Sequence, residues 1–385
     1  MALSNVSLAG LVWEFTFSFG IDHMDEEDDS EAHLSTALRH MSNVRKIVLE
    51  CPYYRGVWIG LFSAPNLKDH LKILELHHDT DLDCTDGTPL FNHQAKFPSL
   101  DNLVIDINFG LEYDHEQLIK SLFINHAGQL KYISITDMIY EDESETLFPQ
   151  NITFPHLLDI SALPAAQFGR HLSDRMPGLR VLKLSRLFDD RPETANEELS
   201  GHFENLRDID ANFFILQLLL SSLRPLRRIR IKEDQKSNWK DFRDTMGMLS
   251  NCSQSLLTLE LNLHLLPTQF GEVLEEAWSF IPSLPHLKTF SMFAPTKWYR
   301  YPQTPFNALA VIPKALFSKL PQLEKFTFQE NKTHNYNDSN MQRDILTHWM
   351  QEEIPPSLHE IVFKSDSDST TTWKRAGNSW EEDRG

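Results

Sequence analysis

Apolar residues along the chain recur in a short pattern, L-x-x-L-x-L, in which other apolar residues often replace leucine. The last two apolar positions alternate with polar ones, which predicts a short β-strand, and the first position lies one turn ahead of it. Successive copies begin about 20 to 36 residues apart. The copies are VRKIVL (44–49), LKILEL (71–76), LDNLVI (100–105), LKYISI (130–135), LLDISA (157–162), LRVLKL (179–184), LRDIDA (206–211), LRRIRI (226–231), LLTLEL (256–261), LKTFSM (287–292), LEKFTF (323–328) and LHEIVF (358–363).

Helical segments separate the predicted strands. Apolar residues recur at helical spacing in segments such as HEQLIKSLFINH (115–126) and MQRDILTHWMQEEI (341–354). Prolines precede many of the strands, as in FPSL (97–100) and KLPQL (319–323). Because proline ends a helix and favours extended backbone, it marks the entry into each strand. The pattern predicts an α/β fold, an irregular leucine-rich-repeat solenoid with parallel strands on its concave face and helices on its convex face.

A doubly wound α/β fold is the alternative, because its strand–helix units also recur every few tens of residues. Such a fold normally has a glycine-rich turn after a strand, at its ligand crevice. The chain has only 14 glycines, and neither G-x-G-x-x-G nor G-x-x-x-x-G-K-S/T occurs in it. The solenoid is therefore the favoured prediction.

The same patterns divide the chain into three predicted parts. Residues 1–43 form a capping region, with an alternating strand (LVWEFTFSF), an acidic stretch (DHMDEEDDSE) and a helix. Residues 44–364 form the array of about twelve irregular repeats. Residues 365–385 contain few apolar side chains and are expected to form a polar, mobile tail. The alternative prediction is that Trp373 and Trp380, within that tail, cap the last repeat.

From about Val44 to Lys364 the sequence resembles the substrate-receptor region of F-box/leucine-rich-repeat proteins of the fungal type. The resemblance rests on the strand motif, on the F-P-x-L and L-P-x-L entries and on the variable helical insertions. Asn108 and Asn331 follow two strands where regular repeats carry asparagine, and most other copies lack it. The resemblance implies an intracellular, F-box-like protein, a ubiquitin ligase substrate receptor with Skp adaptor and cullin as partners if an adaptor-docking segment exists.

No F-box precedes the repeats in this sequence. Either the F-box has been lost, or it lies upstream of this reading frame. The predicted function is therefore a protein–protein interaction scaffold, the substrate-recognition part of such a ligase receptor. The alternative is a stand-alone leucine-rich-repeat binding or inhibitor protein, and an α/β enzyme is a distant third. The architecture alone does not choose among them, since repeat folds serve many functions.

Composition narrows the classes of partner. Asp and Glu number 55 against 36 Lys and Arg, and the net charge of −19 argues against nucleic acid and anionic membranes as partners. Three cysteines without a C-x-x-C pair support neither a disulfide framework nor a zinc module. No uncharged apolar run reaches the length of about 18 residues that a membrane span needs. We expect a protein of a reducing compartment, cytoplasmic or nuclear.

Two segments resemble metal-binding motifs, but each lacks a residue that the motif requires. In HHDTDLDC (77–84), aspartates alternate as in a calcium loop, but Leu90 occupies the position of the bidentate glutamate. A solvated acidic loop is the favoured interpretation, and cation binding remains the alternative. HEQLI (115–119) has Ile119 where a zinc helix needs its second histidine. We therefore predict no enzyme, with no catalytic residues, no cofactor and no metal.

The basic segment RPLRRIRIK (224–232) supplies the first candidate partner-binding residues. With Ile229 and Ile231 directed to the core, the alternating side chains point outward together. The preceding repeat places Asp208, Asp210 and Asn212 opposite them. A ladder of cross-strand ion pairs on a solvated face is one interpretation, and a partner-binding surface is the other. The candidates are Asp208, Asp210, Arg228, Arg230 and Lys232.

A second candidate is the segment WYRYP (298–302) in an expanded interval between repeats. Trp298, Tyr299 and Arg300 are residue types that anchor protein interfaces. They serve equally well to fold an insertion back onto the array. Both interpretations stay open.

The other predicted concave positions are chemically mixed, with no uniform charge and no aromatic stripe. Such a mixture suits a protein partner better than a nucleic acid, which calls for a basic track with aromatic residues. These positions are Lys46, Glu50, Glu75, Asn102, Asp106, Tyr132, Thr136, Lys183, Thr258, Glu260, Thr289, Lys325 and Gln329.

Overall fold

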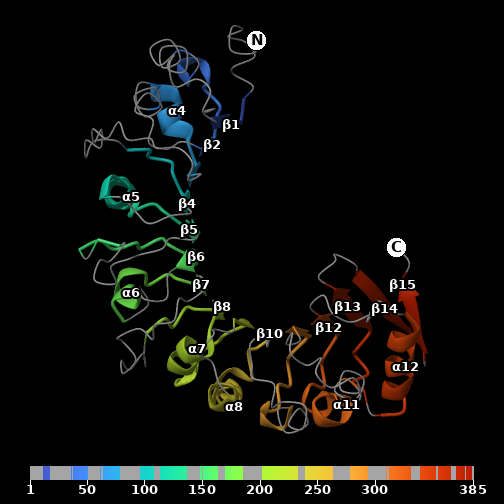
Figure 1. The fold of residues 1–385 in the computed structure, drawn as a ribbon. Coiled ribbons are helices and arrows are strands. Elements are labelled where there is room, and N and C mark those ends of the chain that lie inside the picture. Colours follow the sequence, from blue (N-terminus) through green and yellow to red (C-terminus); the bar gives the residue numbers. More distant parts are fainter. Residues whose placement is uncertain are drawn as a thin grey trace. The chain divides into compact units, whose positions relative to one another are not determined.

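The chain divides into two compact units, Met1–Ser185 and Arg186–Gly385. In the computed structural model each unit is an α/β arrangement of short strands and helices (Figure 1). The structure describes residues 12–17, 36, 38–50, 61, 64–78, 96–107, 113–136, 148–149, 151–163, 170–184, 202–232, 239–262, 278–293, 309, 312–330, 339–352, 354–365, 370–377 and 379–383.

Strands of the first unit follow one another in the sheet in chain order. Each pairs in parallel with the next. Such an order requires the chain to return to the same edge after every strand, as a repeat array does. The strands are β1 (Glu14–Phe17), β2 (Lys46–Leu49), β3 (Ile73–His78), β4 (Asn102–Ile107), β5 (Tyr132–Thr136), β6 (Asp159–Leu163) and β7 (Val181–Leu184).

Helices α4 (Pro65–His70), α5 (Tyr113–His126) and α6 (Arg170–Arg175) lie on one side of these strands (Figure 1). The strand side chains alternate accordingly: Ile47 and Leu49 are buried, whereas Lys46 and Val48 are partly exposed. The apolar positions of the motif therefore face the helices, and the polar positions form the opposite face, here called the open face. Each fully buried leucine or isoleucine stabilises the fold by about 1.5–3 kcal/mol.

In the second unit, six parallel strands are followed by two antiparallel ones. The strands are β8 (Asp208–Ala211), β9 (Arg228–Ile231), β10 (Thr258–Asn262), β11 (Thr289–Phe293), β12 (Lys325–Glu330), β13 (Glu360–Ser365), β14 (Thr370–Ala376) and β15 (Ser379–Asp383). The helices are α7 (Phe213–Leu220), α8 (Trp239–Met248), α11 (Ile312–Ala315) and α12 (Ser339–Trp349), with 3-10 turns η5 (Leu249–Cys252) and η8 (Phe317–Lys319).

The predicted fold class is confirmed strand by strand. Strands β2 to β13 each begin at the third residue of one copy of the leucine motif, and β1 lies within the predicted strand LVWEFTFSF. The division after Ser185 has no counterpart in the sequence pattern, because the motif continues on both sides of it. The acidic stretch at 22–31 lies outside the described residues.

The C-terminal segment differs from the expected mobile tail. Its described part forms β14 and β15, which pair with β13 and with each other in antiparallel fashion. Trp373 of β14 is 1% exposed, and its indole Nε1 donates a hydrogen bond to Gln342 Oε1 of α12 at 2.7 Å. Gly377, with φ of 62°, lies in the turn between the two strands, where glycine adopts positive φ at little cost. Trp373 thus closes the last repeat, as the alternative prediction stated.

Cationic side chains tie neighbouring repeats together by capping backbone carbonyls. Arg175 donates to the carbonyls of Phe148 and Pro149, the latter at 2.8 Å. Lys319 Nζ donates to three carbonyls across an interval of about 40 residues, those of Trp278, Ser279 and Ile281, at 2.8–3.0 Å. Burial lowers the pKa of both side chains. These bonds give backbone carbonyls of one repeat a partner in another repeat.

Candidate protein-binding surface

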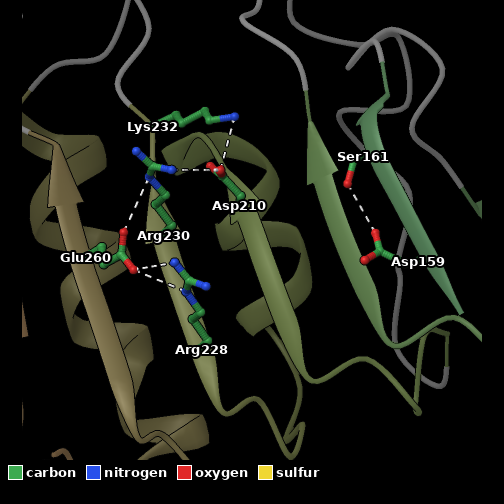
Figure 2. Close-up of polar contacts among 7 residues, drawn as sticks. All are labelled: Asp159, Ser161, Asp210, Arg228, Arg230, Lys232 and Glu260. Atoms are coloured by element: carbon green, nitrogen blue, oxygen red, sulfur yellow. Dashed lines mark hydrogen bonds and ion pairs between the residues drawn. The ribbon is translucent and has the colours of Figure 1, made fainter. Parts of the chain in front are cut away.

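On the open face of the second unit, charged residues of opposite sign stand side by side on adjacent strands. The parallel register pairs Asp208 of β8 with Arg228 of β9, and Asp210 with Arg230. It also pairs Arg230 with Glu260 of β10. Figure 2 shows the resulting group of side chains, here called the Arg230 cluster, which consists of Asp210, Arg228, Arg230, Lys232 and Glu260.

Two carboxylates hold the three cations of the Arg230 cluster. Arg228 donates to Glu260 Oε1 through Nη2 at 2.6 Å and through Nε at 3.1 Å. Arg230 lies between both acids, 3.5 Å from Glu260 Oε2 and 3.8 Å from Asp210 Oδ2. Lys232 Nζ lies 3.1 Å from Asp210 Oδ2. The register thus brings four of the five predicted residues into one network (Figure 2). Asp208 lies in register with Arg228 on the neighbouring strand.

Cations form the outer layer of this cluster and carboxylates the inner one. The Arg228 and Arg230 side chains are 49% and 42% exposed, whereas those of Glu260 and Asp210 are 15% and 9% exposed. Desolvation raises the pKa of Asp210, while Lys232 and Arg230 oppose that shift. Asp210 Oδ1 is buried and has no hydrogen-bond partner among the described residues. A molecule approaching this face therefore meets guanidinium groups first.

Glu260 is the member of the cluster that the sequence prediction left out of the candidate site. It occupies the same position in LLTLEL as Arg230 does in LRRIRI, one repeat earlier. Aligning the repeats by their leucines would have identified Glu260 as a neighbour of Arg230. Asn212 was expected on the open face, but its side chain instead caps α7, with Oδ1 accepting from Ile215 N at 3.0 Å.

Beyond the cluster, the open face of the second unit continues with small hydroxyl side chains. Thr289 and Ser291 of β11 stand beside Thr258 and Glu260 of β10. The next strands bring paired charges again, with Lys325 Nζ 2.5 Å from Glu360 Oε1 and Lys374 Nζ 2.7 Å from Asp383 Oδ2. This mixture of hydroxyl and paired charged groups matches the chemically mixed face that was predicted.

The first unit carries a second charged network on its open face. Lys46 Nζ lies 2.8 Å from Glu14 Oε1 and 3.3 Å from Glu75 Oε1. The hydrogen bond with Glu14 is the largest influence on Lys46 and raises its pKa. His77 bridges Glu75 and Asp106, with Nδ1 3.2 Å from Asp106 Oδ2. A separate hydrogen bond joins Ser161 to Asp159 at 3.2 Å (Figure 2).

Tyr132 is an aromatic side chain on the open face of the first unit. It is 42% exposed and lies in register with Asn102 of β4 and Asp159 of β6. Exposed aromatic residues on a flat face are frequent anchors of protein interfaces. Tyr132 was predicted at an open-face position, without a role in the candidate site.

Other candidates fall wholly or partly outside the described residues. Trp298, Tyr299 and Arg300 lie outside them, as do residues 79–84 of the HHDTDLDC segment. Within the described part of the chain, no group of three or more His, Cys, Asp or Glu residues is arranged to hold a metal ion. None of the described helices is long and apolar enough to cross a membrane.

Comparison with known proteins gives matches to solved structures alone. No family model matches the chain, and no curated protein matches it. The yeast complex of Rad7 and Elc1 contains a chain with 16% identity and a TM-score of 0.42, over 80% of this chain and 76% of that one. A Bacteroides fragilis protein gives 12% identity and a TM-score of 0.32, over 92% of this chain and 74% of its own. At such low scores the fold assignment rests on strand order and register.

Proposed function

We propose that this chain is a protein-binding scaffold that presents the open face of its strands to a protein partner. The observation that carries the proposal is the layering of the Arg230 cluster, with exposed guanidinium groups above covered carboxylates. Arginine is enriched among residues that dominate binding energy, and carboxylates beneath it hold it in a fixed orientation. Asp208, Asp210, Arg228, Arg230 and Lys232 are the proposed contact residues.

The finer proposal is that the scaffold is the substrate-recognition part of an F-box-type ubiquitin ligase receptor. It is supported by the resemblance of residues 44–364 to that family and predicts Skp adaptor and cullin among the partners. Trp298, Tyr299 and Arg300 are proposed as further anchors for the bound protein. The second candidate is a stand-alone leucine-rich-repeat binding or inhibitor protein with no ligase role.

Affinity capture of the tagged chain from its own cells tests these proposals. The wild type is compared with Arg228→Glu/Arg230→Glu and with a control, Lys240→Glu/Arg243→Glu, which makes the same charge change on α8. We expect the open-face variant to lose a captured protein by at least about tenfold, and the control to retain it. Equal recovery by both variants would remove the Arg230 cluster from the binding surface.

The identity of the captured proteins separates the two candidate functions. Recovery of adaptor and cullin with the wild type supports the ligase receptor. Reproducible recovery of other proteins, with neither adaptor nor cullin, supports the stand-alone binding protein. Thermal unfolding of each variant, followed by circular dichroism, shows whether a loss of binding comes from a loss of fold.

A further inference from the structure

The second position of the leucine motif, immediately before each strand, is basic in four repeats of the first unit. Arg45 precedes β2, Lys72 precedes β3, Lys131 precedes β5 and Arg180 precedes β7. All four residues are exposed. Because parallel strands begin at the same edge of a sheet, these side chains stand in one row, here called the basic rim. No candidate site above includes these residues.

Backbone hydrogen bonds hold the basic rim at a fixed spacing. The carbonyl of Arg45 accepts from two successive N–H groups of the next repeat, those of Lys72 and Ile73, both at 2.9 Å. The backbone at the row is thereby fixed at the strand spacing of about 4.8 Å. The same pair of bonds joins Lys72 O to Asp101 and Asn102, Asp101 O to Lys131 and Tyr132, Lys131 O to Leu158 and Asp159, and Leu158 O to Arg180 and Val181.

Much of the positive charge on the basic rim is uncompensated. Among the described residues, the side chains of Lys72 and Arg180 have no hydrogen-bond or ion-pair partner. Lys131 lies 3.4 Å from Asp101, the one carboxylate in the described row, in an exposed pair. Exposed pairs of this kind contribute little energy and exchange partners readily. Four cations against one carboxylate contrast with a chain whose net charge is −19.

We propose that the basic rim binds an extended acidic segment of a protein partner. This inference rests on the proposed scaffold function and names a second surface with its own partner chemistry. Lys72 and Lys131 are two strands apart, as are Lys131 and Arg180, which corresponds to about 10 Å in each case. An extended chain advances about 10 Å in three residues. A segment with a carboxylate at every third residue therefore matches the row of cations.

A protein segment fits this rim better than a nucleic acid does. The net charge of −19 repels a long polyanion, whereas a short acidic segment meets mainly the local field of the rim. Binding of single strands also needs aromatic side chains for base stacking. Trp13 is the aromatic residue in the described row, and the Arg45 guanidinium already lies 4.8 Å from its ring centroid.

The test uses the full chain and a labelled peptide, (Asp-Ser-Gly)4, followed by fluorescence anisotropy at low salt. Its uncharged counterpart, (Asn-Ser-Gly)4, and an oligothymidylate are the comparison probes. The variant Lys72→Glu/Arg180→Glu removes no contact between described side chains, and Lys240→Glu/Arg243→Glu again matches its change in net charge. Carbodiimide coupling of the bound peptide, mapped by mass spectrometry, locates the lysines that it contacts.

We expect saturable binding of the acidic peptide, weakened at least about tenfold by Lys72→Glu/Arg180→Glu and less than about twofold by the control. We also expect coupling at Lys72 and Lys131. The inference would be overturned if the acidic peptide did not bind, if the Asn peptide bound equally well, or if the oligothymidylate bound more tightly. It would also be overturned if both variants lost binding equally, or if coupling were confined to other lysines. The proposed scaffold function would not be affected by such a result, because it is tested separately with Arg228→Glu/Arg230→Glu.

Discussion

The imidazole of His126 in α5 accepts a hydrogen bond from the backbone N–H of Phe97, with 2.9 Å between Phe97 N and His126 Nε2. Its Nδ1 lies 2.8 Å from the carbonyl oxygen of Leu122, to which it donates. The two bonds together assign the neutral tautomer with its proton on Nδ1. His126 is fully buried and joins a helix to the loop of the preceding repeat. The first unit therefore depends on an uncharged histidine.

Acid should destabilise the first unit through His126. Burial is the largest influence and lowers its pKa, with Lys96 adding to the shift and the bond to Leu122 opposing it. The unfolded chain therefore takes up the proton first, so stability is complete above a pH of about 6.5 and falls below it by up to about 1.4 kcal/mol per pH unit. Urea unfolding at pH 7.5 and 5.5 measures this loss.

The matched variant for that measurement is His126→Gln, which keeps an acceptor for Phe97 N and does not titrate. We expect it to be less stable than the wild type at pH 7.5 but to lose less stability between pH 7.5 and 5.5. The same loss in both proteins would contradict the assigned role of His126.

Cys252 should be unreactive in the folded protein. It is 2% exposed, and burial raises the pKa of its thiol to about 12. Since the thiolate is the reactive form, labelling requires unfolding. In a Cys51→Ser/Cys84→Ser background, we expect iodoacetamide at pH 8 to modify Cys252 only in denaturant. Rapid modification without denaturant would show that η5 opens readily.

Trp373 should be essential for the C-terminal repeat. Replacing this buried indole with alanine should cost about 3–5 kcal/mol, because it leaves a cavity beneath α12 and removes the partner of Gln342 Oε1. Lys374→Ala, at the exposed neighbouring residue, should leave stability nearly unchanged. Urea unfolding followed by circular dichroism compares the two variants. Similar stabilities would contradict the capping role of β14.

The Arg228–Glu260 pair should contribute little to folding. Its arginine is 49% exposed, so a double-mutant cycle with Arg228→Ala and Glu260→Ala should give a coupling of about 0.5 kcal/mol. A coupling well above about 1 kcal/mol would favour the interpretation of this ladder as a purely structural feature.

The strands were predictable because the leucine motif encodes burial at every second position. Ile229 and Ile231 face the core, so the outward direction of Arg228 and Arg230 followed at once. The cross-strand pairs of Asp210 needed only the alignment of two repeats. Periodicity therefore predicts the fold and four of the five residues of the Arg230 cluster, all except Glu260.

What escaped prediction depends on contacts between distant parts of the chain. Because the C-terminal segment contains few apolar residues, its pattern did not predict that Trp373 is buried. The hydrogen-bond partner of Trp373, Gln342, lies 31 positions earlier in the chain. The turn at Gly377, between two alternating segments, was the overlooked hairpin signal. The contacts of His126 and Lys319 escaped prediction for a different reason, because their partners are backbone groups that no motif marks.

The most direct test of the scaffold is a dissociation constant measured with a purified captured partner. Wild type, Arg228→Glu/Arg230→Glu and the Lys240→Glu/Arg243→Glu control are compared at physiological salt. The account predicts at least about tenfold weaker binding for the open-face variant alone, with unchanged thermal unfolding. The same dissociation constant for all three proteins would contradict the claim that the Arg230 cluster of the open face binds the partner.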